Sequence, residues 1–419
     1  MLRNYVQRLA QKAGKSVTVA IPFCYSDDTE VLTRDGWKLL KEVTYEDEIA
    51  TLNPETEELE YQKPIAIQKV RYRGKLINFQ GQSYDLLVTP DHRMYVRFSR
   101  PRRKNEATFK FKGAEELAKL SRGGLANYEL KRDFVWKGKD LEYFALPNRF
   151  KFWMAGTKKA VLSSLKSGRM GPVQLRVWPE KKIPMELWLR FLGWWLSEGY
   201  IASNNRIGIA NSNPIYLQEI SSIVKAMGYN PQHNNLRSKY DCIVFRDGQM
   251  HAYLSQFGKA HDKFIPREIK ELPPDKLKIL LETLIKGDGR KSDGSYRTSS
   301  KRLADDVQEI ALKAGYVATV VKDKGREMYT VCIGRSRQTP SISRRPKFVD
   351  YDGFVYDLTV PKHHIIMVRR NGKAVWSSNC DAMTREGHRI ALTFADEVTL
   401  PGSTIAIRKF PENPLSMAH

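Results

Sequence analysis

The sequence predicts a multidomain fold in which an all-β module is interrupted by an α+β domain built from two similar units. Short strand-like segments separated by turns occupy residues 24–96, and strand character returns at 351–368. Between these stretches, apolar residues repeat with the period of amphipathic helices. The length of 419 residues also exceeds one ordinary hydrophobic core, so two or three domains are expected.

The β module begins with segments such as TEVLT, EIATL and LEYQKPIAIQKV, which are separated by the turn signals TRDG and LNPETEE. We expect its first part at 24–135 and its second part at 341–379. Residues 136–184 are basic and irregular, with short aromatic patches between glycines and prolines. This composition favours a linker or an accessory arm that could bind DNA.

Two helices are expected to lead the halves of the α+β domain, which we place at 185–340. The segment 185–200 carries a helical apolar stripe formed by Leu187, Trp188, Phe191, Leu192, Trp195 and Leu196. The segment 275–289 repeats this pattern after the start signals Pro273 and Pro274.

The two halves of this domain resemble each other. Each leading helix is followed by strand-like, helical and strand-like segments. Glu198 and Asp288 lie 90 positions apart, and Gly228 and Gly315 lie 87 apart. An internal duplication of about that period predicts two αββαββ-like units related by a pseudo-two-fold axis.

The net charge of +23 is the strongest compositional feature, and nucleic acid is the commonest partner of so basic a chain. Basic residues concentrate at 97–112 and 289–302. Aromatic residues interleave with them in the first of these stretches. This pattern favours a polyanion-binding surface, although solubility or a generally basic host proteome would also give a positive charge.

Other compositional features exclude several classes of protein. No apolar run approaches the roughly 20 residues that span a bilayer, and the basic N-terminus lacks the apolar core of a secretory signal. Four scattered cysteines without a CxxC pair favour neither a disulfide framework nor a zinc site. We therefore expect a cytoplasmic protein in a reducing compartment.

Reactive residue types border the region between the two β segments. In chain order they are Cys24, then Thr89 and His92 in LVTPDHRMYV, then Asp357 and His364 in YDLTVPKHH, and finally Asn379 and Cys380 in VWSSNC. A single cysteine or histidine is usually structural. The whole set in this order is much harder to attribute to chance.

This pattern resembles the intein family, whose self-splicing module has the Hint fold. The resemblance covers 24–379 and leaves 1–23 and 380–419 as the N-extein and C-extein fragments. It implies that the Cys24 thiol attacks the Phe23 carbonyl and converts the amide into a thioester. His92 would protonate the leaving nitrogen, while Thr89 would help to polarise the scissile bond.

The resemblance also implies the later steps, which need no cofactor. Cys380 would capture the acyl group, and Asp357 resembles the family's aspartate that links the first two steps. The Asn379 carboxamide would then attack its own carbonyl with help from His364, releasing a cyclic imide. The family often has a histidine before the terminal asparagine, whereas this chain has Ser378. We therefore expect cleavage at the C-terminal junction to be the slow step.

The central helices, read as FLGWWLSEG (191–199) and LLETLIKGDG (280–289), resemble the motifs of LAGLIDADG homing endonucleases. Gly193 in mid-helix makes sense if two helices must approach closely. The resemblance implies that Glu198 and Asp288 hold Mg²⁺ over the scissile phosphates. Lys322 is the preferred candidate for a lysine that completes the site, with Lys263 as the second candidate.

The implied partner is double-stranded DNA that carries the intein-free host junction, bound by a monomer through sheets in the major groove. Two other interpretations remain open. The central domain could bind DNA without cutting it, or the chain could be a nucleic-acid-binding protein that does not splice.

The two flanks, read as joined text, resemble the N-terminal region of archaeal secretion-type ATPases, through GHRIALTF and GSTIAIRKF in 387–410. No GxxxxGK[ST] phosphate-binding loop occurs in the sequence, so we assign no ATPase activity to it.

Overall fold

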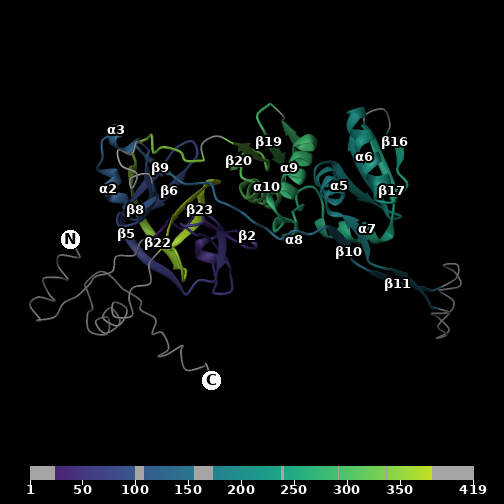
Figure 1. Ribbon diagram of the computed structural model, residues 1–419, viewed down its shortest axis with the longest axis horizontal. Coiled ribbons are helices and arrows are strands. Elements are labelled where there is room, and N and C mark those ends of the chain that lie inside the picture. The colour runs from purple at the N-terminus through teal and green to yellow at the C-terminus, as the bar shows by residue number, and fades with distance from the viewer. Residues whose placement is uncertain are drawn as a thin grey trace, which may run out of the picture. The chain divides into compact units, whose positions relative to one another are not determined.

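The computed structural model describes residues 24–99, 108–154, 173–236, 240–290, 292–335 and 338–379. Strand and helix packing divides the chain into two compact units (Figure 1). Unit 1 comprises Met1–Val135 and Arg335–His419, and unit 2 comprises Trp136–Gly334. Phe23, Cys380 and the two flanks, 1–23 and 380–419, lie outside the described residues.

Unit 1 is made of β-strands from both ends of the chain. Strand β5 (Ala66–Gln80) pairs antiparallel with β22 (Lys347–Thr359) along the whole length of β22. Strand β1 (Glu30–Thr33) likewise pairs with β23 (Ile365–Arg370), which pairs with β24 (Lys373–Ser378). The early and late segments therefore form one module, as their shared strand character predicted.

The remaining elements of unit 1 complete its sheets and cover its core. The short strands are β2 (Gly36–Leu39), β3 (Ile49–Leu52), β4 (Leu59–Gln62), β6 (Asp85–Val88), β7 (Arg93–Phe98), β8 (Lys110–Gly113) and β9 (Tyr128–Leu130). The helical segments are η1 (Leu40–Glu42), α2 (Ala114–Ala118) and α3 (Arg122–Leu125). Buried apolar side chains from both parts of the chain share one core, including Val31, Ile77, Phe79, Val88, Leu358, Ile366 and Val375.

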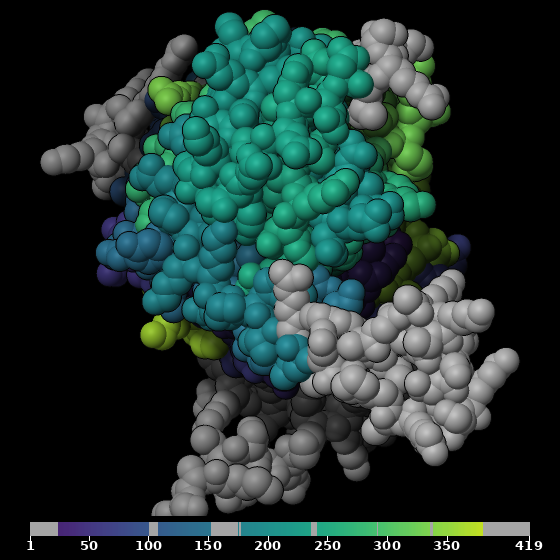
Figure 2. All heavy atoms as spheres, turned by 90° about the vertical axis from the view of Figure 1, so that its right-hand side faces the viewer, coloured from purple at the N-terminus to yellow at the C-terminus, as the bar shows by residue number. Residues whose placement is uncertain are grey.

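Unit 2 contains the same sequence of elements twice, as the duplication predicted. The first half is α5 (Met185–Glu198), β14 (Gly199–Ala202), β15 (Arg206–Asn211), α6 (Pro214–Ala226), β16 (Gln232–Leu236) and β17 (Tyr240–Arg246). The second half is α9 (Pro274–Asp288), β18 (Gly289–Arg290), β19 (Ser295–Thr298), α10 (Lys301–Lys313), β20 (Val317–Lys322) and β21 (Tyr329–Gly334). The strand orders also correspond, β14-β15-β17-β16 and β18-β19-β21-β20. Figure 2 views the molecule from the side of unit 2, whose teal and green residues form most of that face.

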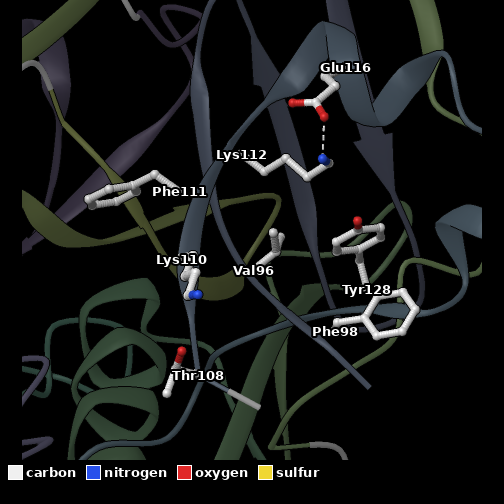
Figure 3. Close-up of a pocket in the computed structure, with 8 residues that line it drawn as sticks. All are labelled: Val96, Phe98, Thr108, Lys110, Phe111, Lys112, Glu116 and Tyr128. Atoms are coloured by element: carbon white, nitrogen blue, oxygen red, sulfur yellow. Dashed lines mark hydrogen bonds and ion pairs between the residues drawn. The ribbon is translucent and has the colours of Figure 1, made fainter. Parts of the chain in front are cut away.

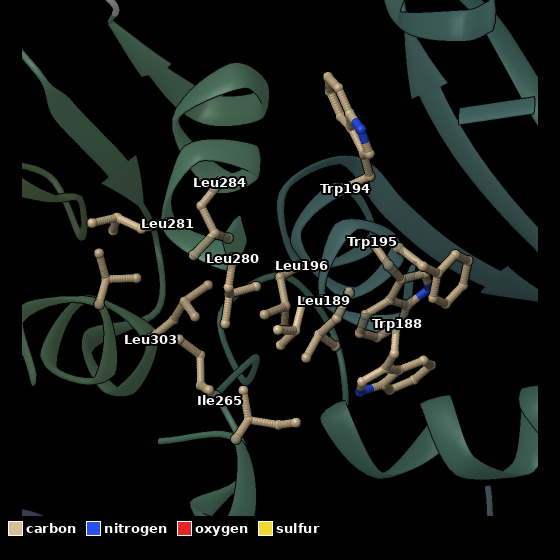
Figure 4. Packing of buried hydrophobic residues seen from close by; sticks show 14 of the residues in the cluster. Trp188, Leu189, Trp194, Trp195, Leu196, Ile265, Leu280, Leu281, Leu284 and Leu303 are labelled. Atoms are coloured by element: carbon tan, nitrogen blue, oxygen red, sulfur yellow. The ribbon is translucent and has the colours of Figure 1, made fainter. Parts of the chain in front are cut away.

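The leading helices α5 and α9 pack closely against each other. A Cβ added to Gly193 would lie 2.7 Å from the Thr283 Cβ, and one added to Gly287 would lie 2.4 Å from the Ser197 Cβ. Such distances are far inside van der Waals contact, so glycine at these points allows the two backbones to approach. Buried leucines of both helices and the tryptophans of α5 lie in one core (Figure 4).

The described parts of 136–184, which are 136–154 and 173–184, are more regular than the irregular linker that the composition of this stretch predicted. Strand β10 (Tyr143–Leu146) pairs with β13 (Lys181–Pro184), and the Phe144 ring stacks on Trp188 with centroids 3.9 Å apart. Phe144, Leu146 and Ile183 are buried in the core of unit 2, which explains why this pair is ordered. A second pair, β11 (Arg149–Met154) with β12 (Val173–Trp178), forms a hairpin beyond it.

Three further helical segments join the two halves of unit 2: α7 (Gly248–Leu254), η3 (Ser255–Phe257) and α8 (Arg267–Lys270). Across the part of the chain that the structure describes, no helix is both long and apolar enough to cross a membrane.

Candidate functional sites

The first site lies in unit 1, where strand pairing holds Cys24 against two distant segments. The Cys24 N–H donates to Thr89 Oγ1 at 3.0 Å, and the Thr89 N–H donates back to the Cys24 carbonyl at 3.0 Å. The next residue, Tyr25, exchanges two backbone hydrogen bonds of 2.9 Å with Tyr356. Cys24 and Thr89 are fully buried. The segment that begins at Cys24 is therefore held by Thr89 on one side and by Tyr356 on the other.

His92 connects this segment to the last strand. Its N–H donates to the Thr89 carbonyl at 3.0 Å, in the turn between β6 and β7. Its buried ring places Nε2 3.0 Å from the Ser377 hydroxyl of β24, and the Tyr25 ring meets it edge-on at 4.5 Å. The Tyr25 hydroxyl also donates to the Ser378 carbonyl. Residues next to Cys24 and residues next to Asn379 therefore share one set of contacts.

Asn379 ends the described part of the chain in the same region. Its N–H donates to the His364 carbonyl at 3.1 Å, and its own carbonyl accepts from Arg93 Nη2 at 3.5 Å. His363 and His364 have φ of 68° and 52°, so two left-handed residues form the turn between β22 and β23. Asn379 is fully buried, and no described residue hydrogen-bonds to its carboxamide. A buried amide without a partner is costly, which is typical of a group kept for chemistry.

Asp357 completes the set on β22. It is buried, and its Oδ1 accepts from the Leu358 N–H at 2.8 Å. Its neighbour Tyr356 is the residue that pairs with Tyr25. The structure thus gathers in unit 1 the six predicted residues that it describes, namely Cys24, Thr89, His92, Asp357, His364 and Asn379.

Two residues of this site, Ser377 and Arg93, were not identified from the sequence. Ser377 was detectable in principle, because alternate residues of a strand point to the same face and Ser377 lies two positions before Asn379. Arg93 had only its adjacency to His92 as a signal. Nothing in its residue type indicated that it would contact Asn379, 286 positions away.

The second site lies in unit 2, where Glu198 and Asp288 are the last residues of α5 and α9. Burial is the main cause that raises the pKa of Asp288 to about 7, and the charge of Glu198 raises it further. Burial likewise raises the pKa of Glu198. The packing of the two helices therefore brings the predicted carboxyl groups close enough to interact electrostatically.

Lys263 is the lysine that accompanies this pair. Its Nζ donates to the carbonyls of Trp195, Leu196 and Gly199 at 2.8, 3.0 and 2.8 Å, at the C-terminal end of α5. Burial lowers the pKa of Lys263 to about 8, although the negative charges of Asp288 and Glu198 act to raise it.

Lys322, the preferred candidate from the sequence, is placed differently. It ends β20 with an exposed side chain that bonds to Glu327 at 2.6 Å. The structure thus brings Lys263, rather than Lys322, to the carboxyl pair. The reason is local: the acidic residue in the turn after β20 engages Lys322 at the protein surface.

The pair has the chemistry of a site for a hard divalent cation. The charge of Glu198 raises the pKa of Asp288, and a cation bound beside such carboxylates stabilises their ionised form. Carboxylate oxygens are the protein ligands that Mg²⁺ prefers, and water or phosphate oxygens commonly complete its shell. Glu198 and Asp288 are the residues that would hold the ion.

A third feature is a basic and aromatic groove on the sheet β8-β7-β9 of unit 1, with a volume of about 560 Å³ (Figure 3). It is lined by Val96, Phe98, Thr108, Lys110, Phe111, Lys112, Glu116 and Tyr128. The cations interleaved with aromatics at 97–112 form cation–π stacks nearby, with Arg97 4.9 Å from the Phe109 ring. Residues 100–107 of that stretch lie outside the described part.

Comparison with known families finds a match that falls mainly on the second half of unit 2. Residues 275–341 match the family model described as a LAGLIDADG-like domain. This stretch includes α9, with Asp288 at its end, and the strands β18 to β21. The second half of unit 2 is therefore similar to a LAGLIDADG-like domain.

Solved structures similar to this chain include I-DmoI in complex with DNA and Ca, at 13% identity with a TM-score of 0.30, covering 37% of this chain and 85% of that one. Another is full-length DUF199/WhiA from Thermatoga maritima, at 9% identity with a TM-score of 0.28, covering 37% of this chain and 52% of that one.

Two curated relatives match most of this chain at 28% identity. One is an ATP-dependent Clp protease proteolytic subunit of Chlamydomonas moewusii, with an alignment 340 residues long that covers 77% of this chain and 31% of the relative. The other is a DNA-directed RNA polymerase subunit beta C-terminal section of Stigeoclonium helveticum, with an alignment 431 residues long that covers 85% of this chain and 36% of the relative. The chain thus spans about a third of the length of each.

Proposed function

We propose that residues 24–379 are a self-splicing element that excises itself and joins Phe23 to Cys380. The observation that carries this proposal is the convergence of Cys24 and Asn379, 355 positions apart, on one buried polar site. A further support comes from the two relatives. Their names denote unrelated proteins, yet most of this chain matches a minor part of each, as an insertion into unrelated hosts would.

The contacts at Cys24 suit the first step. The Cys24 nitrogen belongs to the bond to be broken, and its N–H is held by Thr89 Oγ1 at 3.0 Å. As the Cys24 sulfur attacks the Phe23 carbonyl, the carbon–nitrogen bond breaks and the nitrogen must gain a proton. His92, held by Ser377 and Tyr25, is the group that would carry the proton from the thiol to this nitrogen.

The later steps follow from the other end of the site. Transfer of the acyl group to Cys380 would give a branched chain. Asp357 would link thioester formation at Cys24 to this transfer. The Asn379 carboxamide would then attack its own carbonyl carbon and release the amino group of Cys380, with His364 assisting the proton transfer. In this scheme 24–135 and 341–379 form the splicing module.

The test is to weigh the products of the wild-type chain after expression. Splicing gives a free 24–379 species and a ligated flank product. Cys24→Ala should abolish both, while Asn379→Ala should stop release at the C-terminal junction. A correctly folded wild-type chain that stays at full mass under reducing conditions, across pH and temperature, would refute the proposal.

A second activity is favoured by the carboxyl pair of unit 2. We infer that 185–340 is a site-specific DNA endonuclease. The match to a LAGLIDADG-like domain supports this proposal. So do Glu198 and Asp288 at the C-terminal ends of the paired helices, with Lys263 beside them. A bound divalent ion, Mg²⁺ by preference, would supply a nucleophilic water and neutralise the leaving oxygen. The protein's own part is to hold two ionised carboxylates and a lysine at the scissile phosphates.

This second proposal is tested with DNA that carries the uninterrupted host junction. Mg²⁺-dependent double-strand cleavage near the junction is the expected result, and Asp288→Asn should remove it. Binding of the same DNA without cleavage by the wild type would favour the alternative, a central domain that recognises DNA but no longer cuts it.

A further inference from the structure

The C-terminal junction lacks the histidine that precedes the terminal asparagine in many inteins, and the structure contains a different group at the reacting carbonyl. The geometry points to Arg93 as the residue that stabilises the negative charge on the Asn379 carbonyl oxygen during release of the C-terminal flank. This inference rests on the proposed splicing function and assigns it a further catalytic residue.

The first reason is the identity of the contacted atom. Arg93 Nη2 donates to the Asn379 carbonyl oxygen, and this carbonyl is the one that the Asn379 carboxamide must attack. In that step the carboxamide nitrogen bonds to the carbonyl carbon, and the bond to the Cys380 nitrogen breaks. The proton lost by the carboxamide passes to the leaving nitrogen. Between these events, the carbonyl oxygen carries a negative charge.

The second reason is the length of the contact. At 3.5 Å it is longer than an ordinary hydrogen bond, so it stabilises the neutral carbonyl only weakly. A guanidinium attracts an oxyanion far more strongly than a carbonyl, so the contact should tighten as charge develops. An interaction that strengthens in the transition state lowers the barrier, whereas one made equally in both states does not.

The third reason is that Arg93 and Asn379 are both held in position. Arg93 begins β7, and its guanidinium lies over the Phe111 ring of β8 at 4.9 Å. The end of β24 is fixed by the Ser377–His92 contact and by the Tyr25 hydroxyl on the Ser378 carbonyl. A pre-positioned donor loses little freedom when the charge appears.

Ser378 does not supply this contact. Its hydroxyl is buried, and within the described ranges it has no hydrogen-bond partner. His92 and Arg93 therefore divide the work between the junctions: His92 serves the bond before Cys24, and its neighbour Arg93 serves the bond after Asn379.

The experiment compares Arg93→Ala with Arg97→Ala in the full chain. Arg97 is a matched control, because it lies on the same strand and stacks on an aromatic ring at the same distance of 4.9 Å, but it bonds to Glu129. Thioester formation is followed by cleavage with a thiol, and release of the C-terminal flank is followed by mass. Thermal melting checks that each variant is folded.

Arg93→Ala should slow release of the C-terminal flank by about 10²-fold and accumulate the branched intermediate, while the rate of thioester formation stays within about threefold of wild type. Added guanidinium, well below unfolding concentrations, should restore release in Arg93→Ala and not in Asn379→Ala. Arg93→Lys should recover part of the rate.

Other results would overturn the assignment. If the wild type splices and Arg93→Ala releases its flank as fast as Arg97→Ala does, Arg93 has no such role. Equal slowing of both steps without rescue by guanidinium would show a purely structural role. A wild-type chain that never splices would instead remove the proposed function itself, and this assignment with it.

Discussion

The two sites hold their reactive groups in different ways. In unit 1, hydrogen bonds of paired segments fix Cys24 and Asn379. In unit 2, Glu198 and Asp288 are brought together by helix packing, and burial shifts their pKa values. Backbone pairing suits a reaction on the backbone itself, whereas a pair of carboxyl groups with access to solvent suits capture of a cation and a phosphate.

The largest expected effects come from removing one reactive group in each unit. Cys24→Ala should reduce splicing by at least about 10³-fold and leave DNA cleavage unchanged, because the nucleophile is lost and unit 2 is untouched. Asp288→Asn should remove DNA cleavage and leave splicing unchanged. Product masses and cleavage of junction DNA are measured on both variants.

Each variant thus serves as the control for the other. A loss of DNA cleavage in Cys24→Ala, with unit 2 still folded by its melting transition, would contradict the independence of the two sites.

A smaller effect distinguishes the two lysines of unit 2. Lys263→Met should lower the rate of DNA cleavage by about 10²-fold, because it removes a buried cation beside Glu198 and Asp288. Lys322→Met should change the rate less than about threefold, since its exposed side chain contacts Glu327. Single-turnover cleavage rates give the comparison, and equal losses in the two variants would reject it.

The sequence predicted the parts of this molecule that leave a periodic or chemical signal. The repeated αββαββ order followed from apolar spacing, and Gly193 was correctly associated with close helix packing. Cys24, Thr89, His92 and Asn379 were identified because their residue types suit a particular reaction in a particular order. The structure then brought these residues together.

The parts that were not predicted depend on the path of the chain in space. Arg93 and Ser377 contact partners nearly 300 positions away, and neither residue type is specific to such a site. Lys263 was ranked below Lys322 because spacing along the chain does not show whether a loop lysine or a lysine at a strand end lies nearer to the carboxyl pair. The pairing of β10 with β13 was missed since the two strands are separated by more than 30 residues.

The pH dependence of stability should also differ between the units. The pKa of Asp288 is raised from 3.8 to about 7, so its contribution to stability is complete below pH 4 and is lost as the pH rises through 7. Asp288→Asn does not titrate there. Relative to wild type, this variant should therefore gain stability between pH 5 and pH 8 in the free energy of unfolding of unit 2, by an amount that the solvent exposure of Asp288 keeps small.

Chemical denaturation of both proteins at the two pH values measures this gain. Under the proposed endonuclease function, Mg²⁺ binds the ionised pair, so it should stabilise the wild type more at pH 8 than at pH 5 and should affect the variant little. A difference between the two proteins that does not change with pH would contradict the raised pKa.

The smallest expected effect concerns a single methyl group in each unit. In α5, Gly193→Ala places a Cβ 2.7 Å from the Thr283 Cβ, and the overpacking should cost about 2 kcal/mol. The higher helix propensity of alanine offsets about 1 kcal/mol, which leaves a net loss of about 1 kcal/mol in unit 2. In α3 of unit 1, a Cβ at Gly123 meets nothing within 4 Å, so Gly123→Ala should stabilise slightly. Opposite shifts of the two melting transitions are expected, and a stabilised Gly193→Ala would show that the helices can separate without loss.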